Sequence, residues 1–288
     1  MKKYFKLLMI SSLVFITSGC FKTDSMDDIE IYTSVYPVEF ITSSIYGDHA
    51  DVNSIYPDGI VVNSYELTDK LISDYSEGDL LIYNGLGEEK EYAKDMLNKN
   101  KKMKIIDVSM GMEYTSGIEE LWLDPSNFLM MAQNIRMGFK QYITNKYLEK
   151  EIDENYDKLK LQASELDAEL KLIVENADNK TLIVSNDMFK YLEKYGLEII
   201  SLEENDNLTD KMKSDANKLI TSDKINYIFI KKYEQVNNTI QNLLNTTNVN
   251  LLTIDTLSSI SEDDRENKET YISLMKKNIE LFKKELYQ

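Results

Sequence analysis

Short apolar segments alternate with amphipathic segments along most of this chain, and the alternation occurs in two separate blocks. The first block predicts strands at residues 29–33, 52–56, 79–83 and 103–108. It also predicts helices from Pro37 to Ile45, near 68–75 and at 88–98. The second block predicts strands at residues 181–184, 197–202, 225–230 and 249–254, again separated by helices. Strands that alternate with helices favour parallel pairing, so we expect an α/β fold with two lobes, each a mainly parallel four-stranded sheet flanked by helices.

A long helix is predicted between the two blocks. No proline or glycine occurs from Lys146 to Ala177, and apolar residues recur there at spacings of three and four. They are Ile152, Tyr156, Leu159, Ala163, Leu166, Leu170 and Ile173. A coiled coil is the alternative, but the pattern covers only about three heptads, so we expect a helix packed along the body. The predicted domains are an N-terminal lobe at 29–124, a helical connection at 125–177 and a C-terminal lobe at 178–288.

The corner at Glu119 to Pro125 contains the only tryptophan of the chain, Trp122. Asp124 and Ser126 are candidate N-caps on either side of Pro125, which suits the first position of a helix. Two interpretations are open. The corner is either a loop-to-helix turn packed by Trp122, or a place where Glu120 holds a ligand.

The N-terminus has the composition of a targeting segment. Three lysines within the first six residues precede an apolar run at 7–16, which is too short for an ordinary membrane-spanning helix. The run ends in Thr17-Ser18-Gly19-Cys20, which resembles a bacterial lipobox, although Thr17 stands where leucine is usual. We therefore expect a signal peptide at 1–19, lipidation of Cys20 and a polar tether at 20–28. A plain secretory signal is the alternative. Either way, we expect the protein outside the cytoplasm.

Charge and residue content exclude several classes of function. The formal net charge is −17, and it becomes −20 without residues 1–19, which argues against nucleic acid as a partner. The single histidine, His49, and the single cysteine, Cys20, make Ser-His-Asp and Cys-His catalysis implausible. No glycine-rich phosphate loop is present. We do not expect an enzyme.

Several stretches together resemble the solute-binding lipoproteins of zinc and manganese ABC transporters. The segment 79–87 reads Asp-Leu-Leu-Ile-Tyr-Asn-Gly-Leu-Gly, and the corner 122–125 reads Trp-Leu-Asp-Pro. The resemblance extends over the mature chain and agrees with two lobes joined by a long helix. It implies a metal between the lobes, an ABC permease as partner, attachment to the membrane through a lipid anchor, and a monomer.

The positions that ligate metal in that family are substituted in this chain. Asn63, Glu120 and Asn186 stand where the family has histidine, and Lys231 stands where an acidic residue is common, whereas Asp255 is retained. Zinc prefers imidazole and thiolate, whereas these oxygen donors suit harder cations such as Mn²⁺. The resemblance implies a divalent cation, Zn or Mn, only if this substituted site still binds one.

Lys231 leads to a specific hypothesis. A protonated ammonium cannot ligate a metal, so we expect Lys231 to replace the metal as the cation between the lobes, paired with Glu120 and Asp255. The alternative is that Lys231 and Lys232 both point into solvent. Two functions remain open: a solute-binding component of an importer, or a surface interaction or adhesion-type lipoprotein without a transported ligand. Aromatic residues that would suit an organic ligand are Tyr36, Tyr65, Tyr114, Trp122 and Tyr233, although packing is their more usual role.

Overall fold

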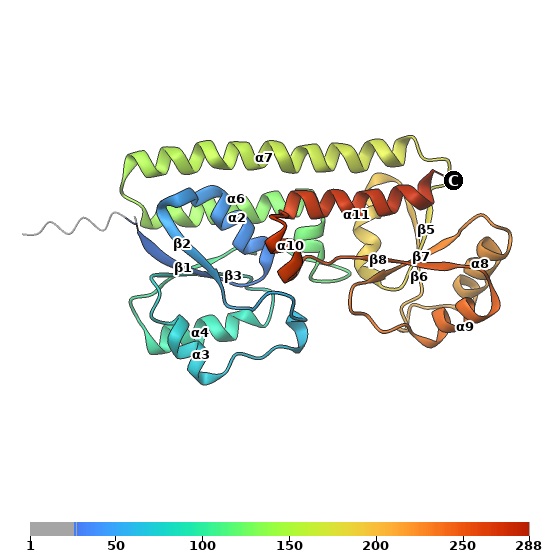
Figure 1. Cartoon of the computed structure of the whole chain (residues 1–288), viewed down its shortest axis with the longest axis horizontal. Coiled ribbons are helices and arrows are strands. Elements are labelled where there is room, and N and C mark those ends of the chain that lie inside the picture. Colours follow the sequence, from blue (N-terminus) through green and yellow to red (C-terminus); the bar gives the residue numbers. More distant parts are fainter. Residues whose placement is uncertain (1–25, 27, 288) are drawn as a thin grey trace, which may run out of the picture.

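Two lobes lie side by side against a layer of long helices (Figure 1). The computed structural model describes residue 26 and residues 28–287. The predicted signal peptide at 1–19, the predicted lipidation site Cys20 and most of the predicted tether lie outside the described residues. Within the described part of the chain, no helix combines the length and the apolar character needed to cross a bilayer.

The N-terminal lobe contains the parallel sheet that the sequence predicts. Its strands have the order β2-β1-β3-β4, and each neighbouring pair is parallel. They are β1 (Ile29–Thr33), β2 (Ala50–Ser54), β3 (Leu80–Tyr83) and β4 (Lys104–Asp107). The helices of this lobe are α2 (Tyr36–Tyr46), α3 (Asp69–Tyr75) and α4 (Glu89–Lys99), with 3-10 helices at Gly47–His49 and Val62–Ser64. The second strand begins two residues earlier than predicted, because Ala50 pairs with Ile29.

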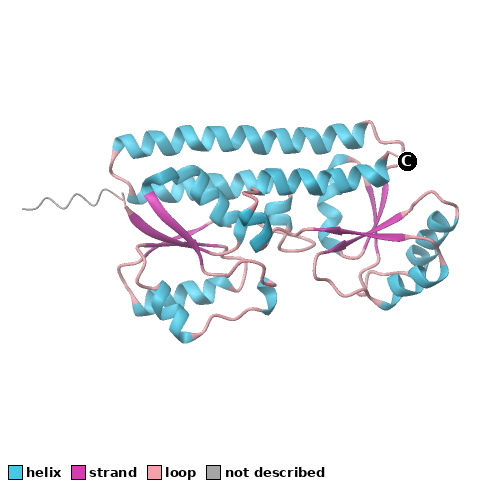
Figure 2. Ribbon diagram, in the orientation of Figure 1, coloured by secondary structure: helices cyan, strands magenta, loops and turns pink. Residues whose placement is uncertain are grey.

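The C-terminal lobe repeats this arrangement, with the strand order β6-β5-β7-β8 and parallel pairs throughout. Its strands are β5 (Thr181–Val184), β6 (Glu198–Ser201), β7 (Tyr227–Lys231) and β8 (Asn250–Ile254). Its helices are the 3-10 helix Asp187–Tyr195, α8 (Asp210–Thr221) and α9 (Asn238–Thr246). Figure 2 shows helices on both faces of each sheet. The predicted fold class is therefore confirmed.

The two lobes share one hydrophobic core. Successive strand residues point to opposite faces of a sheet, and in β5 this places Leu182 and Val184 in the main core but Ile183 in a second, smaller core. The main core also contains the buried residues of the N-terminal lobe and of the long helices. One face of the C-terminal sheet is thus packed into the same apolar interior as the other lobe.

The long helix predicted from Lys146 is α7 (Lys146–Glu175). Its seven predicted apolar positions are all buried, and it packs against α2, α6 (Pro125–Tyr142) and α11 (Tyr271–Leu286) of the same chain. Asn145 caps its first turn, since the Asn145 side chain accepts a hydrogen bond from Tyr147 N. The prediction of a helix packed along the body is confirmed.

After β8, the chain returns to the N-terminal lobe. The backbone N–H of Tyr36 donates to Ser258 O at 3.0 Å, and that of Gly59 donates to Ile260 O at 2.7 Å. The short helix α10 (Glu262–Glu266) lies between the lobes in Figure 1. The predicted C-terminal lobe at 178–288 thus includes a segment that packs on the other lobe.

Arg265 of α10 fixes this returning segment. Its Nη1 and Nη2 atoms lie 2.8 and 3.1 Å from the two carboxylate oxygens of Glu39, and its Nη2 lies 2.8 Å from Asp58 Oδ1. Glu39 and Asp58 both belong to the N-terminal lobe. Hydrogen bonds to Glu39 and Asp58 raise the pKa of Arg265, so its guanidinium stays charged in this contact.

Candidate functional site

The loops that follow the carboxyl ends of several strands meet between the lobes, which is where open α/β sheets bind ligands. A cleft of about 260 Å³ lies there. The N-terminal lobe contributes residues 60–63, and Glu119 lies on the same side of the cleft. The C-terminal lobe contributes residues 231–234, from the end of β7, and Asp255, which follows β8.

An ion pair spans this cleft. Lys231 Nζ lies 3.4 Å from Glu119 Oε1, and the two side chains are 22% and 10% exposed. Lys231 ends β7, whereas Glu119 immediately precedes the one-turn helix α5 (Glu120–Leu123). Because both groups are largely removed from water, loss of either one would leave the other as an unpaired, partly buried charge.

The turn after Lys231 is held by Glu234. The carboxylate of Glu234 accepts a 3.0 Å hydrogen bond from the backbone N–H of Lys231 and another from the Ser185 hydroxyl. Ser185 directly follows β5. The end of β7 is therefore fixed to the neighbouring strand, and this fixes where the Lys231 side chain starts.

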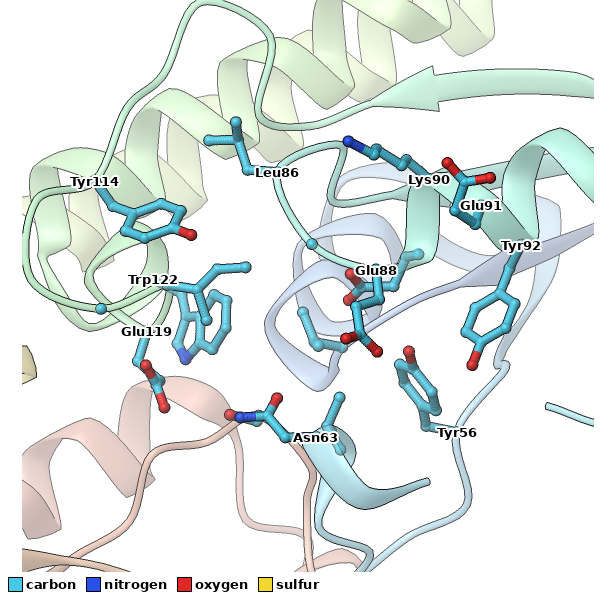
Figure 3. Close-up of a pocket in the computed structure, with 17 residues that line it drawn as sticks. Tyr56, Asn63, Leu86, Glu88, Lys90, Glu91, Tyr92, Tyr114, Glu119 and Trp122 are labelled. Carbon is cyan, nitrogen blue, oxygen red and sulfur yellow. The ribbon is translucent and has the colours of Figure 1, made fainter. Parts of the chain in front are cut away.

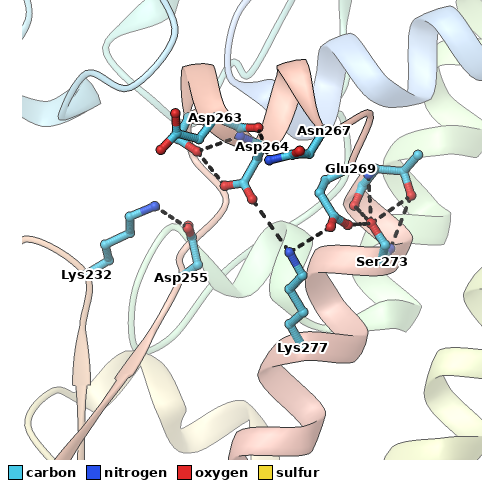
Figure 4. A network of polar contacts seen from close by, with 10 residues as sticks. Lys232, Asp255, Asp263, Asp264, Asn267, Glu269, Ser273 and Lys277 are labelled. Atoms are coloured by element: carbon cyan, nitrogen blue, oxygen red, sulfur yellow. Dashed lines mark hydrogen bonds and ion pairs between the residues drawn. The ribbon is translucent and has the colours of Figure 1, made fainter.

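A second ion pair in the cleft joins Lys232 to Asp255 at 2.6 Å (Figure 4). The other carboxylate oxygen of Asp255 accepts a 2.9 Å hydrogen bond from Leu257 N. The side-chain amide of Asn278 accepts a hydrogen bond from the backbone N–H of Asp255 and donates one to the backbone C=O of Asp255. Burial lowers the pKa of Lys232, but the hydrogen bond and charge of Asp255 outweigh it and raise the pKa above its usual value. Asp255 is thus fully engaged within its own lobe.

The remaining contacts in Figure 4 belong to the returning segment rather than to the cleft. Lys277 Nζ lies 2.8 Å from Glu269 and 3.6 Å from Asp264. These contacts join α11 to α10 and the loop between them. Lys277 is 55% exposed, so its contribution is that of a surface ion pair.

Two of the predicted site residues make local contacts instead. Glu120 Oε2 accepts hydrogen bonds from the backbone N–H groups of Thr115 and Ser116 at 3.1 and 3.3 Å, which closes the loop before α5. Asn186 Oδ1 accepts a 3.0 Å bond from Met188 N and caps the 3-10 helix. Neither side chain lines the cleft.

The partners predicted for Lys231 were wrong. Glu119, not Glu120, forms its ion pair, because consecutive residues around a helical turn point about 100° apart and only one of them faces the cleft. Asp255 pairs with Lys232, since side chains alternate at the end of a strand and the two lysines diverge. The roles of Glu119, Lys232 and Glu234 were not predicted from the sequence. No local signal distinguishes Glu119 from Glu120.

The cleft offers few ligands for a metal. Asn63 and Asp255 both line it, as the family positions imply, but Lys231 and Lys232 lie beside them. Among residue 26 and residues 28–287, no three His, Cys, Asp or Glu side chains are grouped in a way that would hold a metal ion. Of the carboxylates in the cleft, Glu119 and Asp255 pair with lysine ammonium groups instead, and Glu234 accepts hydrogen bonds from Ser185 and from the Lys231 backbone.

Trp122 connects the two lobes behind the cleft. Its indole N–H donates a 2.7 Å hydrogen bond to Thr256 O, and its backbone carbonyl accepts one from the Tyr271 hydroxyl. The Tyr271 ring stacks on Phe128 of α6, with ring centres 4.1 Å apart. Asp124, rather than Ser126, caps α6 through Ser126 N. The corner therefore has the packing role that one of the two interpretations predicts.

A second and larger cavity, of about 930 Å³, adjoins the cleft (Figure 3). It shares Asn63 and Glu119 with the cleft and extends to the first turn of α4. Figure 3 shows Tyr114 and Trp122 on one side and Tyr56 and Tyr92 on the other.

The chain matches a known family over most of its length. The family model described as zinc-uptake complex component A, periplasmic (ZnuA), matches residues 31–285. The zinc-binding lipoprotein AdcA of Streptococcus pneumoniae is 26% identical over 98% of this chain, which spans 61% of the length of AdcA. The high-affinity zinc uptake protein ZnuA of Bacillus subtilis is 23% identical, with 99% and 98% of the two chains covered. The manganese ABC transporter substrate-binding lipoprotein PsaA of Streptococcus mitis is 27% identical, with 95% of each covered.

Solved structures share the two-lobed fold. The Zn(II)-bound ZnuA-like domain of Streptococcus pneumoniae AdcA has a TM-score of 0.73 at 23% identity, covering 91% of this chain and all of that domain. The metal-dependent lipoprotein YcdH of Bacillus subtilis has a TM-score of 0.75 at 19% identity, with 91% and 100% covered.

Proposed function

This chain belongs to the ZnuA family of zinc-uptake components, and from that premise we propose that it is the solute-binding lipoprotein of an ABC importer. The family and the named relatives are uptake and binding proteins, not enzymes. Several of these relatives are lipoproteins by name, which supports a lipid anchor at Cys20 and a place on the outer face of the membrane. An ABC permease would be its partner.

We propose further that Lys231 takes the place of the metal between the lobes. The observation that carries this is the 3.4 Å contact of Lys231 Nζ with Glu119, across the cleft where the family resemblance places the metal. A divalent cation in that position would meet two ammonium groups within the same cleft. Like charges at such short range in a partly buried site repel strongly. The cleft therefore suits a protein cation better than Zn²⁺ or Mn²⁺.

Metal analysis tests this proposal. Protein purified without chelators should carry neither Zn nor Mn in stoichiometric amount, and neither ion should raise its melting temperature. A metal at about 100 times its Kd would instead stabilise the fold by about 2.7 kcal/mol. Lys231→Gln leaves Glu119 unpaired, so Mn²⁺ should stabilise this variant more than the wild type.

Lys277→Gln is the matched control, because Lys277 lies outside the cleft and its removal should leave the response to Mn²⁺ unchanged. Stoichiometric Zn or Mn in the wild type would refute the replacement of the metal by Lys231, although transport would remain the function.

A surface interaction without a transported ligand is the second candidate. It is favoured by the two ion pairs inside the cleft, which satisfy its charges without any solute. It predicts that no metal or small solute shifts the melting temperature, while the protein still binds a protein or cell surface.

A further inference from the structure

The 930 Å³ cavity at the start of α4 has features that the metal-site resemblance does not explain. It lies beside the Lys231 cleft but reaches a different part of the N-terminal lobe, residues 86–92, which form the end of the loop after β3 and the first turn of α4. Its volume lies in the range that small organic ligands occupy and far exceeds what one ion requires.

Glu89, at the first position of α4, is the unexpected group in its wall. The residue is 5% exposed, yet it carries a carboxylate. Among the contacts of the described residues, the only hydrogen bond that it receives comes from its own backbone N–H. Burial, followed by the nearby charge of Glu88, raises the pKa of Glu89 to about 7. Buried carboxylates normally have a cationic or strongly hydrogen-bonding partner.

Gly87 makes room for this carboxylate. A β-carbon at position 87 would lie only 1.8 Å from Glu89 Oε2, so any larger residue would displace the acid. Helix dipoles favour acidic residues at a first turn, but that effect does not require burial. Glu91 stands on the same turn, is exposed and pairs with Lys94. Burial of Glu89 therefore needs another reason.

Aromatic rings surround the space next to Glu89. Tyr56 and Trp122 are buried, at 6% and 2% exposed, and Tyr114 is 42% exposed at the opening. Burial raises the pKa of Tyr56, and the charge of Glu89 raises it further. Both residues line this cavity. Carboxylates combined with the faces of aromatic rings are the surroundings that bind ammonium groups.

The charges of the cavity wall also favour a cation. Glu119 is neutralised by Lys231 and Glu91 by Lys94. Glu88 and Glu89 remain. Among the lysines that the structure describes, only Lys90, an exposed residue, lines the same space. Figure 3 shows Glu88 between the Trp122 side and the Tyr56 side.

We propose that this cavity binds an organic cation, with an ammonium group placed against Glu89 between the aromatic rings. This inference rests on the proposed solute-binding function and names the class of solute. An anion would meet two carboxylates, and a neutral molecule would leave Glu89 without a counter-charge. A bare metal ion would leave most of the cavity and its aromatic walls unused.

A matched pair of probes tests the proposal by isothermal titration and thermal melts. 1,4-Diaminobutane and 1,4-butanediol have the same carbon chain and differ in their charge. The diamine should bind and raise the melting temperature, and the diol should not. Glu89→Gln keeps the shape of the side chain but removes its charge, and should weaken diamine binding about tenfold or more. Tyr114→Ala, at an exposed ring, should weaken it several-fold.

Two controls assign the binding to this cavity. Glu77→Gln changes an exposed glutamate of the same lobe outside the cavity and should leave diamine affinity unchanged. Lys277→Gln should also leave it within about twofold, since Lys277 lines neither this cavity nor the neighbouring cleft. A diamine that binds equally well to Glu89→Gln, a diol that binds as well as the diamine, or no binding of either probe overturns the inference.

The outcome can be separated from that of the proposed function. If a different solute bound and Glu89→Gln did not change its affinity, the importer function would stand, and only the proposal of an organic cation would be refuted. Diamine binding by a protein that associates with no permease would support the cavity and refute the importer.

Discussion

Glu89→Gln is expected to stabilise the unliganded protein, and the gain should increase with pH. Burial raises the pKa of Glu89 from 4.5 to about 7, so the folded state holds this proton more tightly than the unfolded state does. This tighter proton binding stabilises the folded state, and the stabilisation is fully present below the unfolded pKa of 4.5. It is lost as the pH rises through the folded pKa of about 7. Linkage then makes the cost of the buried charge roughly 3 kcal/mol at pH 8, but less than about 1 kcal/mol at pH 5.

Urea denaturation of wild type and variant at these two pH values measures this difference. Glutamine cannot ionise, so the variant should lack this part of the pH dependence. Removing any one negative charge from this acidic protein also changes its stability, and that general effect must be separated from the effect of burying Glu89. Glu77→Gln is the control, because it removes one exposed charge from the same lobe. If the stability difference between Glu89→Gln and wild type is the same at both pH values, the carboxylate is not held in an apolar environment, and the argument for a cation next to it fails.

Three other substitutions have expected outcomes that denaturant unfolding can check. Trp122→Phe removes the indole N–H that bonds Thr256 O across the lobes and should cost about 1–3 kcal/mol; an unchanged midpoint would mean that this bond does not join the lobes. In Arg265→Lys, the single ammonium group cannot bond both oxygens of Glu39 and also reach Asp58, so the free energy of unfolding should fall by about 1–2 kcal/mol. Lys277→Arg, at a surface ion pair, should have little effect. Asn145→Ala removes the side-chain cap of α7 and should cost about 1 kcal/mol, with Asn145→Asp retaining most of the stability.

The positions of strands and helices were readable in the sequence because they depend on local periodicity. The seven apolar residues of α7 recur every three or four positions, and that spacing alone places them on one buried face. Strand β5 was predicted at its observed residues, because a short apolar run between turn-forming residues has few other options.

The site was less predictable than the fold. Asn63 and Asp255 line the cleft as the family resemblance implies, but Asn186 acts as a helix cap and Glu120 closes its own loop. Side chains such as asparagine and glutamate bond local backbone groups as readily as they bind ligands. A sequence motif gives the position of such a residue along the chain and leaves the direction of its side chain open.

The sequence by itself determined the two parallel sheets, the connecting helix and the excess of negative charge, because each follows from residue type and spacing. Only the tertiary structure decided that Glu119 meets Lys231, a residue 112 positions away, and that Lys232 rather than Lys231 holds Asp255. It also decided that Glu89 of a charged helix is buried in the wall of a cavity that Tyr56 also lines. The reason is that ion pairs and burial depend on distances between elements far apart in the chain, and no local pattern records those distances.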